Sequence, residues 1–196
     1  MGNSSLLNSD CLKVAIVGTR KATPSGLATA RNIAKQLGEA GMVVVSGLAF
    51  GIDKAAHLGC LDAGGKTIAV LANGLDQIYP RQHQSLAESI LKTGGVIVSE
   101  YEREKPYLPS QFLERNRIIS GLSHGVIIIE APFGSGALNT AAHAIEQNRE
   151  VFIVPGDINN PNYAGSHHLI KQGAALITSA KDIFAAINIE VNDKQK

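Results

Sequence analysis

Residues 12–47 read LKVAIVGTRKATPSGLATARNIAKQLGEAGMVVVSG, and this stretch decides the fold. The β-branched run Val14–Val17 predicts a strand, and Ser25–Ala40 has apolar residues at helical spacing. Gly41 ends this helix, and Val43–Val45 predicts a second strand. A strand, a helix and a second strand joined by short links are typical of a parallel sheet covered by helices.

The same alternation continues through the rest of the chain. Further strands are expected at Thr67–Leu71, Val96–Val98, Val126–Ile129, Val151–Val154 and Ala175–Ile177. Further helices are expected at Asp53–Ala63, Ser85–Lys92, Ala137–Gln147, Ser166–Lys171 and Lys181–Ile187. The run Val126–Ile129 is entirely apolar, as expected of a central parallel strand that is buried on both faces. We therefore predict an α/β fold with a mainly parallel sheet.

The composition fits one compact domain. The 196 residues suffice for a buried core, and the charged fraction of 18% leaves little polar surface. We expect a single domain over residues 11–189, with flexible ends at 1–10 and 190–196. The sequence contains no run of about 18 apolar residues, so no membrane span is expected. Cys11 and Cys60 lack metal-ligand spacing, which favours idle thiols in a reducing cytoplasm.

Positive charge is concentrated locally. The net charge is only +1, so binding to nucleic acid cannot be inferred from the overall charge. Residues 12–38 nevertheless contain five basic side chains and no acidic one. A local basic patch of this kind can attract a phosphate backbone.

Three glycine-containing loops follow strands, where ligands bind in parallel sheets. Their candidate residues are Gly18, Thr19, Arg20, Lys21, Ser46, Gly47, Gly134, Ser135 and Gly136. Backbone N–H groups in such loops can bind phosphates, and Arg20 adds a guanidinium that can hold a phosphate with two bonds. Each loop can also be a tight turn without a ligand. Neither the dinucleotide-binding pattern nor a Walker loop is present.

A fourth candidate segment, FLERNRIISGLS, occupies residues 112–123. Arg115 and Arg117 flank Asn116, and Phe112 supplies an aromatic ring. Cationic groups for phosphates together with an aromatic ring for base stacking are typical of sites for single-stranded nucleic acid. The alternative is a solvent-exposed basic helix over the sheet.

Catalytic arrangements are scarce. Asp53 and His57 lie one helical turn apart, and we interpret them as a helix N-cap and its structural partner rather than as a catalytic pair. The six histidines form no spaced ligand set with Asp, Glu or Cys, and a Gly-x-Ser-x-Gly motif is missing. We therefore expect neither an enzyme nor a metal site.

The phrases GTRKATPSG, VVSGLAFGIDKAAH, IAVLANGLDQIYP, FLERNRIISGLS, EAPFGSGALNTAAHAIEQNREVFIVPG and GSHHLIKQGA together resemble, in this order, the core of the DNA-processing protein A family, also called DprA or Smf. The resemblance covers residues 12–180. It implies an extended Rossmann-like three-layer domain, cytoplasmic and without a cofactor, that binds single-stranded DNA through the candidate residues above. It also implies homodimers that protect incoming DNA in natural transformation and help to load the RecA recombinase.

The chain departs from the family pattern in places. Family members often have a basic residue where Phe50 stands and a lysine where Gly134 stands, so we expect weaker phosphate contact. The chain lacks room for the helical N-terminal domain and the C-terminal winged helix of many members. We expect either a shortened chain or a minimal member.

Two other functions remain open on the same fold. One is a small-nucleotide sensor that uses the same cleft. The other is a nucleotide phosphoribohydrolase of the LOG type, whose catalytic glutamate is replaced here by Thr140. His143 lies three residues further on, where it could contact Thr140 along a helix and rescue that chemistry.

Overall fold

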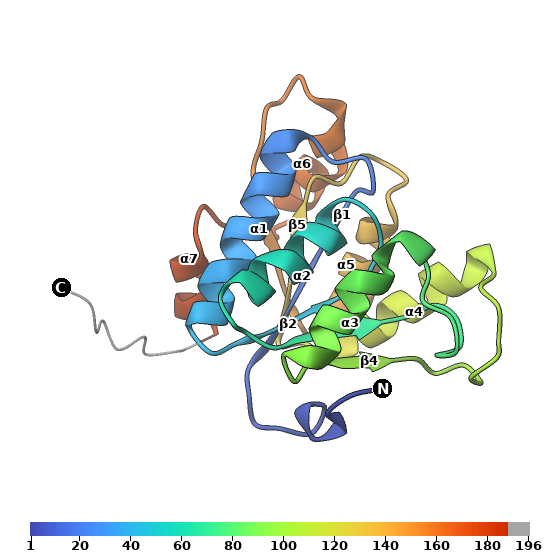
Figure 1. The fold of residues 1–196 in the computed structure, drawn as a ribbon. Helices are drawn as coiled ribbons and strands as arrows, with labels where there is room; N and C mark the ends of the chain where they lie inside the picture. The colour runs from blue at the N-terminus through green and yellow to red at the C-terminus, as the bar shows by residue number, and fades with distance from the viewer. Residues whose placement is uncertain (188–196) are drawn as a thin grey trace.

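The computed structural model describes residues 1–187 and contains a seven-stranded parallel sheet in the order β4-β3-β2-β1-β5-β6-β7 (Figure 1). The strands are β1 (Lys13–Gly18), β2 (Val43–Ser46), β3 (Thr67–Val70), β4 (Val96–Val98), β5 (Gly125–Ile129), β6 (Glu150–Ile153) and β7 (Ala175–Leu176). The α-helices are α1 (Pro24–Glu39), α2 (Ile52–Asp62), α3 (Gln84–Lys92), α4 (Pro109–Gly121), α5 (Gly136–Glu146), α6 (Ala164–Lys171) and α7 (Ala180–Ala186). Short 3-10 turns lie at η1 (Ser4–Leu6), η2 (Arg81–His83) and η3 (Pro161–Tyr163).

The α/β fold class predicted from the sequence is confirmed, and every strand pair within the sheet is parallel. Each predicted strand and helix is present within one or two residues of its expected bounds. The helix α4 was not predicted as an element of its own. Its apolar residues are interrupted by Glu114, Arg115, Asn116 and Arg117, so the segment shows little helical periodicity.

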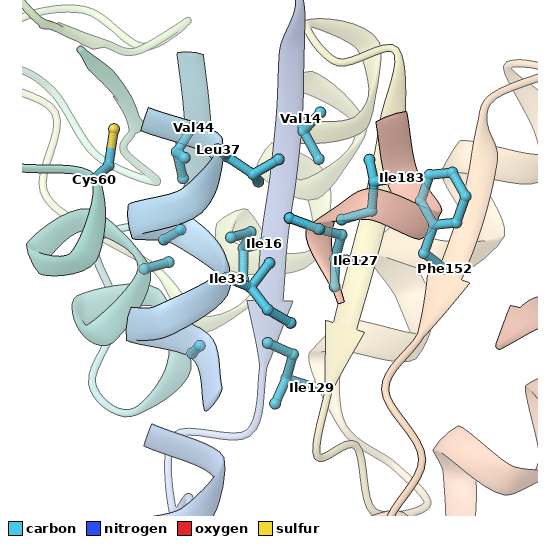
Figure 2. Packing of buried hydrophobic residues seen from close by; sticks show 14 of the residues in the cluster. Val14, Ile16, Ile33, Leu37, Val44, Cys60, Ile127, Ile129, Phe152 and Ile183 are labelled. Carbon is cyan, nitrogen blue, oxygen red and sulfur yellow. The ribbon is translucent and has the colours of Figure 1, made fainter. Parts of the chain in front are cut away.

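Helices cover both faces of the sheet and make three layers. Side chains alternate between the faces of a strand, so Val14 and Ile16 of β1 face one layer while Ala15 and Val17 face the other. The first layer contains α1, α2 and α7, whose buried residues pack with β1, β2, β5 and β6 (Figure 2). The second contains α4, α5 and α6. Burial on both faces explains why the central strands are continuously apolar.

Residues 1–10 lie against the edge strand β4. The N-terminal amine donates to the Ile97 carbonyl at 2.6 Å, Gly2 forms an antiparallel bridge with Val96, and Leu6 is buried. These contacts do not measure motion, and the flexibility expected for residues 1–10 stays a prediction. The expected domain end at 189 and the flexible tail at 190–196 lie outside the described residues.

The strand order creates a switch point between β1 and β5. From β1 the chain continues outward to β2, β3 and β4, whereas β5 is followed on the other side by β6 and β7. Loops that leave the carboxyl ends of β1 and β5 therefore turn in opposite directions and leave a crevice between them. Two of the three glycine-containing loops, those after β1 and β5, flank this crevice.

Candidate nucleic-acid interface

A cleft of about 390 Å³ opens at the switch point. Gly18 and Arg20 reach it from the β1–α1 loop, Phe112 and Asn116 from α4, and Gly136 from the start of α5. With Arg115 of α4, six predicted site residues from three separate segments therefore share one cavity. A concave site with few polar groups at this position is typical of ligand binding.

Arg20 and three aromatic rings form the exposed wall of the cleft. The Arg20 guanidinium carbon lies 4.8 Å from the centroid of the Phe112 ring, a cation–π contact. Tyr79 and Tyr107 complete the cluster, with ring centroids 4.0 Å apart and at 5.6 and 6.1 Å from Phe112. Sequence reasoning missed both tyrosines, because they stand in irregular loops with no periodicity or charge pattern to distinguish them.

The β1–α1 loop that presents Arg20 is anchored by the buried carboxylate of Glu130. That carboxylate accepts hydrogen bonds from the Thr23 amide at 2.8 Å, from the Thr23 hydroxyl, and from the Tyr163 hydroxyl at 3.2 Å. Thr23 in turn caps α1 by accepting from the Gly26 amide at 3.0 Å. Burial, together with the nearby Glu130 carboxylate, raises the pKa of Tyr163 to about 12. The loop is therefore held in place before any ligand binds.

Arg115 lines the floor of the cleft and is almost entirely buried, with only 4% of its surface exposed. Its Nη1 donates to the Gly47 carbonyl at 2.8 Å and to the Val70 carbonyl. Burial lowers the pKa of Arg115 to about 10, and the charge of Asp53 opposes this lowering. The guanidinium therefore stays charged near neutral pH. Phosphate contact was the role expected for Arg115, but this side chain mainly joins three elements at the cleft floor.

Asp53 is buried, is influenced by the charge of this arginine, and bonds to the loop after β2. It accepts from the Gly47 amide at 3.1 Å and from the Ala49 amide at 3.3 Å. Burial raises the pKa of Asp53, and Arg115 and these two amides oppose that rise. The expected N-cap role is wrong, because Gly51 occupies the N-cap position of α2. The Gly47 amide is engaged by Asp53 and is not free for a phosphate.

His57 and Ser46 are buried, and their side chains bond to groups inside the protein. His57 Nδ1 lies 2.7 Å from the Thr67 hydroxyl, so the expected pairing with Asp53 does not form. Burial lowers the pKa of His57 to about 3, and His83 and Arg115 add to this effect. The Ser46 hydroxyl donates to the Ile16 carbonyl at 2.7 Å and is fully buried.

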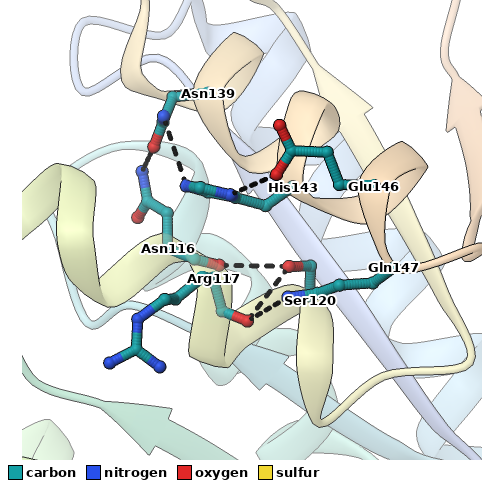
Figure 3. A network of polar contacts seen from close by, with 7 residues as sticks. All are labelled: Asn116, Arg117, Ser120, Asn139, His143, Glu146 and Gln147. Atoms are coloured by element: carbon teal, nitrogen blue, oxygen red, sulfur yellow. Dashed lines mark hydrogen bonds and ion pairs between the residues drawn. The ribbon is translucent and has the colours of Figure 1, made fainter.

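Asn116 connects α4 to α5, as Figure 3 shows. Its Nδ2 donates to the Gly136 carbonyl and to Asn139 Oδ1, both at 3.1 Å. The carbonyl oxygen of Arg117 accepts from Ser120 and Gln147, whereas its guanidinium points away from this network and pairs with Glu100. Glu130 is not the partner of Arg117, because it is buried among donors near α1.

The remaining candidates lie at the rim of the cleft. Thr19 is buried, and its hydroxyl accepts from the amide of the exposed Lys21 at 3.2 Å. Gly134 has a φ of +78° and a Cβ there would meet no neighbour, so the loop before α5 is open to solvent. Ser135 caps α5 by accepting from the Ala137 amide at 3.2 Å. DNA contact by these residues stays a prediction.

Thr140 and His143 do not form the pair that could rescue hydrolase chemistry. Thr140 is buried, and its hydroxyl donates to the Gly136 carbonyl at 3.4 Å. The imidazole of His143 instead lies 3.2 Å from Glu146 and 3.4 Å from Asn139 (Figure 3). Among residues 1–187, no cluster of three His, Cys, Asp or Glu side chains could hold a metal ion. In the same range, no helix is long and apolar enough to cross a membrane.

Comparison with known sequences finds one family. A family model described as DNA recombination-mediator protein A matches residues 1–188. Protein Smf of Escherichia coli (strain K12) is 48% identical over 171 residues, which are 87% of this chain and 46% of that protein. DNA processing protein DprA of Streptococcus pneumoniae is 44% identical over 173 residues, which are 88% of this chain and 61% of that protein. The chain thus spans about half the length of the curated relatives it matches.

Comparison with solved structures finds members of the same family. DprA from Streptococcus pneumoniae superposes with a TM-score of 0.87 at 43% identity, over 97% of this chain and 65% of that one. DprA from Helicobacter pylori, described as having a unique single-stranded DNA binding mode, gives 0.86 at 33% identity, over 95% of this chain and 84% of that one. The molybdenum cofactor carrier protein of Chlamydomonas reinhardtii shares the fold alone, with a TM-score of 0.63 at 16% identity.

Proposed function

Since the chain belongs to the DNA recombination-mediator protein A family, we propose that it binds single-stranded DNA in the cleft at the β1–β5 switch point. The observation that supports this most directly is Arg20 beside the ring of Phe112, with Tyr79 and Tyr107 next to it. Arg20 forms no ion pair with any residue in the described range, so its charge is available for a phosphate.

The proposed mode of binding follows from the chemistry of the cleft wall. Arg20 contacts a phosphate through its guanidinium fork, and unstacked bases pack on the aromatic rings. Every base has a π-face, so we expect little sequence selectivity. A duplex hides its bases in the stack, and none of the cleft residues stands on a helix placed to enter a groove. Single strands are therefore the expected ligand.

We propose a binding function without catalysis. Thr140 stands where the LOG-type hydrolase needs a carboxylate, and its hydroxyl donates to the Gly136 carbonyl rather than to a base that could take its proton. The expected consequence is that nucleoside monophosphates release no free base. The small-nucleotide sensor is the second candidate, because a cleft of about 390 Å³ is large enough for a single nucleotide.

The wider role proposed for the protein rests on its family. We propose that it acts in the cytoplasm as a homodimer, protects incoming single strands in natural transformation and helps to load the RecA recombinase. Exposed apolar side chains at the end of α5 and on the edge strand β7, Ile145 and Leu176, lie outside the cleft and support a self-association surface there. Light scattering at tens of micromolar, a range that detects weak association, tests the dimer, and a monomer there contradicts it.

One binding experiment tests the central proposal. Fluorescence anisotropy compares a labelled single strand with its duplex, and we expect tighter binding of the single strand that weakens as salt rises. Equal affinity for both forms, or no dependence on salt, would contradict the proposal. Competition by mononucleotides at concentrations similar to those of the oligonucleotide would favour the sensor instead.

A further inference from the structure

A groove of about 590 Å³ lies between α1 and α2, next to the cleft. Its apolar floor includes Leu27 of α1 and Leu58 of α2, and the ring of Phe50 forms one side. Phe50 is 43% exposed and Leu27 is 36% exposed. An aromatic ring left in water over an apolar groove is unfavourable unless something packs against it.

The backbone and a neighbouring ring hold Phe50 in this exposed position. Gly51 has a φ of +74°, and a Cβ on it would come within 2.3 Å of the Thr19 carbonyl oxygen. The Ile52 amide donates to the same carbonyl at 3.3 Å. The Phe50 ring meets the buried His83 edge-on, with centroids 4.8 Å apart. These contacts place the Phe50 ring beside the groove, with part of its surface exposed.

The groove has a positive charge and no acidic residue in its lining within the described part of the chain. The cations are Arg20, Arg31 and Lys54. Arg31 is neutralised by Asp62, with Nε and Nη2 at 2.5 and 3.0 Å from the carboxylate oxygens. Arg20 and Lys54 have no ion pair among residues 1–187. Two free cations beside an exposed ring suit a polyanion with aromatic groups better than an apolar peptide.

The groove is continuous with the cleft. Arg20 lines both cavities, and the loops that present Arg20 and Phe50 are joined by the hydrogen bond between Ile52 and Thr19. A strand that leaves the cleft past Arg20 therefore arrives at Phe50. The groove repeats the combination found in the cleft, an unpaired cation next to an exposed aromatic ring.

We propose that this groove is a second subsite for the same DNA strand, in which a base stacks on Phe50 and Lys54 contacts a phosphate. The inference rests on the proposed function and extends it. It predicts a binding site longer than the cleft alone, with the additional nucleotides held by α1 and α2.

The test uses oligothymidylates at the two ends of the usual range of site sizes, about 4 and about 16 nucleotides. Phe50→Ala should weaken binding of the long strand about 5- to 150-fold, the range expected for the loss of one stacked base. It should leave the short strand within about twofold, because the short strand is held in the cleft. Thermal melting of the variant checks that the exposed substitution leaves the fold intact.

A charge variant gives a second measurement. Lys54→Gln should reduce the slope of log affinity against log salt by about 0.7 for the long strand, the effect of one lost phosphate contact, and leave the slope for the short strand unchanged. Lys92→Gln is the matched control, because Lys92 ends α3 outside both cavities.

The outcomes separate the two claims. If the native protein binds neither oligonucleotide, the proposed function and this inference both fail. If it binds both and the two variants change neither affinity, or change both equally, the groove is not a DNA subsite while the cleft proposal stands. A loss confined to the long strand supports the groove.

Discussion

Replacement of Arg115 by methionine should destabilise the protein strongly, although the residue belongs to the segment first interpreted as a DNA contact. Arg115 is buried, and its guanidinium donates to the Gly47 and Val70 carbonyls beside the buried carboxylate of Asp53. Methionine fills a similar volume but donates no hydrogen bond, so both carbonyls lose a donor and Asp53 loses its counter-charge.

The expected loss is about 3–5 kcal/mol, because two buried carbonyls each lose a donor at about 1–3 kcal/mol and the nearby buried Asp53 loses a favourable charge. With an m-value of about 2 kcal/mol per molar urea, the unfolding midpoint should fall by about 2 M. The chain has no tryptophan, so the transition is followed by far-UV circular dichroism. Arg20→Met is the matched control, because Arg20 is exposed and its loss should change stability by less than about 0.5 kcal/mol.

A double-mutant cycle with Asp53→Asn isolates the interaction between the two charges. The double variant should be more stable than the sum of the single effects predicts, by about 0.5–3 kcal/mol, because the second substitution removes the charge that the first left unpaired. If Arg115→Met shifts the urea midpoint by less than about 0.5 M, the guanidinium does not support the cleft floor, and the reasoning is refuted.

Two further predictions concern buried groups. Glu130→Gln should lower the melting temperature by about 2–10 °C, because an amide replaces one of the carboxylate oxygens that accept from Thr23 and Tyr163; an unchanged melting curve would show that this anchor is dispensable. The free energy of unfolding should fall as pH drops below about 6, by about 2 kcal/mol at pH 5, because the unfolded chain protonates His57 near its ordinary pKa of 6.5 and the folded protein binds that proton only near a pKa of about 3. Urea titrations from pH 7 to about 5 should give a shallower dependence for His57→Gln, and equal slopes would contradict this assignment.

The sheet could be predicted from the sequence because its strands are short apolar runs and its helices have a regular apolar face. The family resemblance drawn from the sequence phrases is also confirmed. The helix α4 was anticipated only in the alternative interpretation of residues 112–123, because Arg115 and Asn116 bond to other segments instead of presenting an apolar stripe.

The site was only partly predictable. Gly18, Arg20 and Gly136 could be predicted as cleft residues from their place at or after the end of a strand. The carboxyl ends of parallel strands converge on one edge of the sheet, where ligands bind. Which side chains are exposed could not be predicted, since residue type does not distinguish the exposed Arg20 from the buried Arg115. The partners of Glu130 and Asp53 come from segments distant in sequence or from loop amides, which no local pattern reveals.

Arg20 is the residue on which DNA binding in the cleft depends most, and the direct test compares Arg20→Ala with Arg103→Ala in binding to one single-stranded oligonucleotide across a salt series. Arg103 is exposed, pairs with Asp76 and lines none of the cavities described above, so it controls for the loss of one surface charge. Arg20→Ala should weaken binding about tenfold or more and reduce the salt slope by about 0.7, while Arg103→Ala and the melting curves stay unchanged. If Arg20→Ala binds the single strand with the affinity and salt slope of the parent protein, DNA does not bind in this cleft.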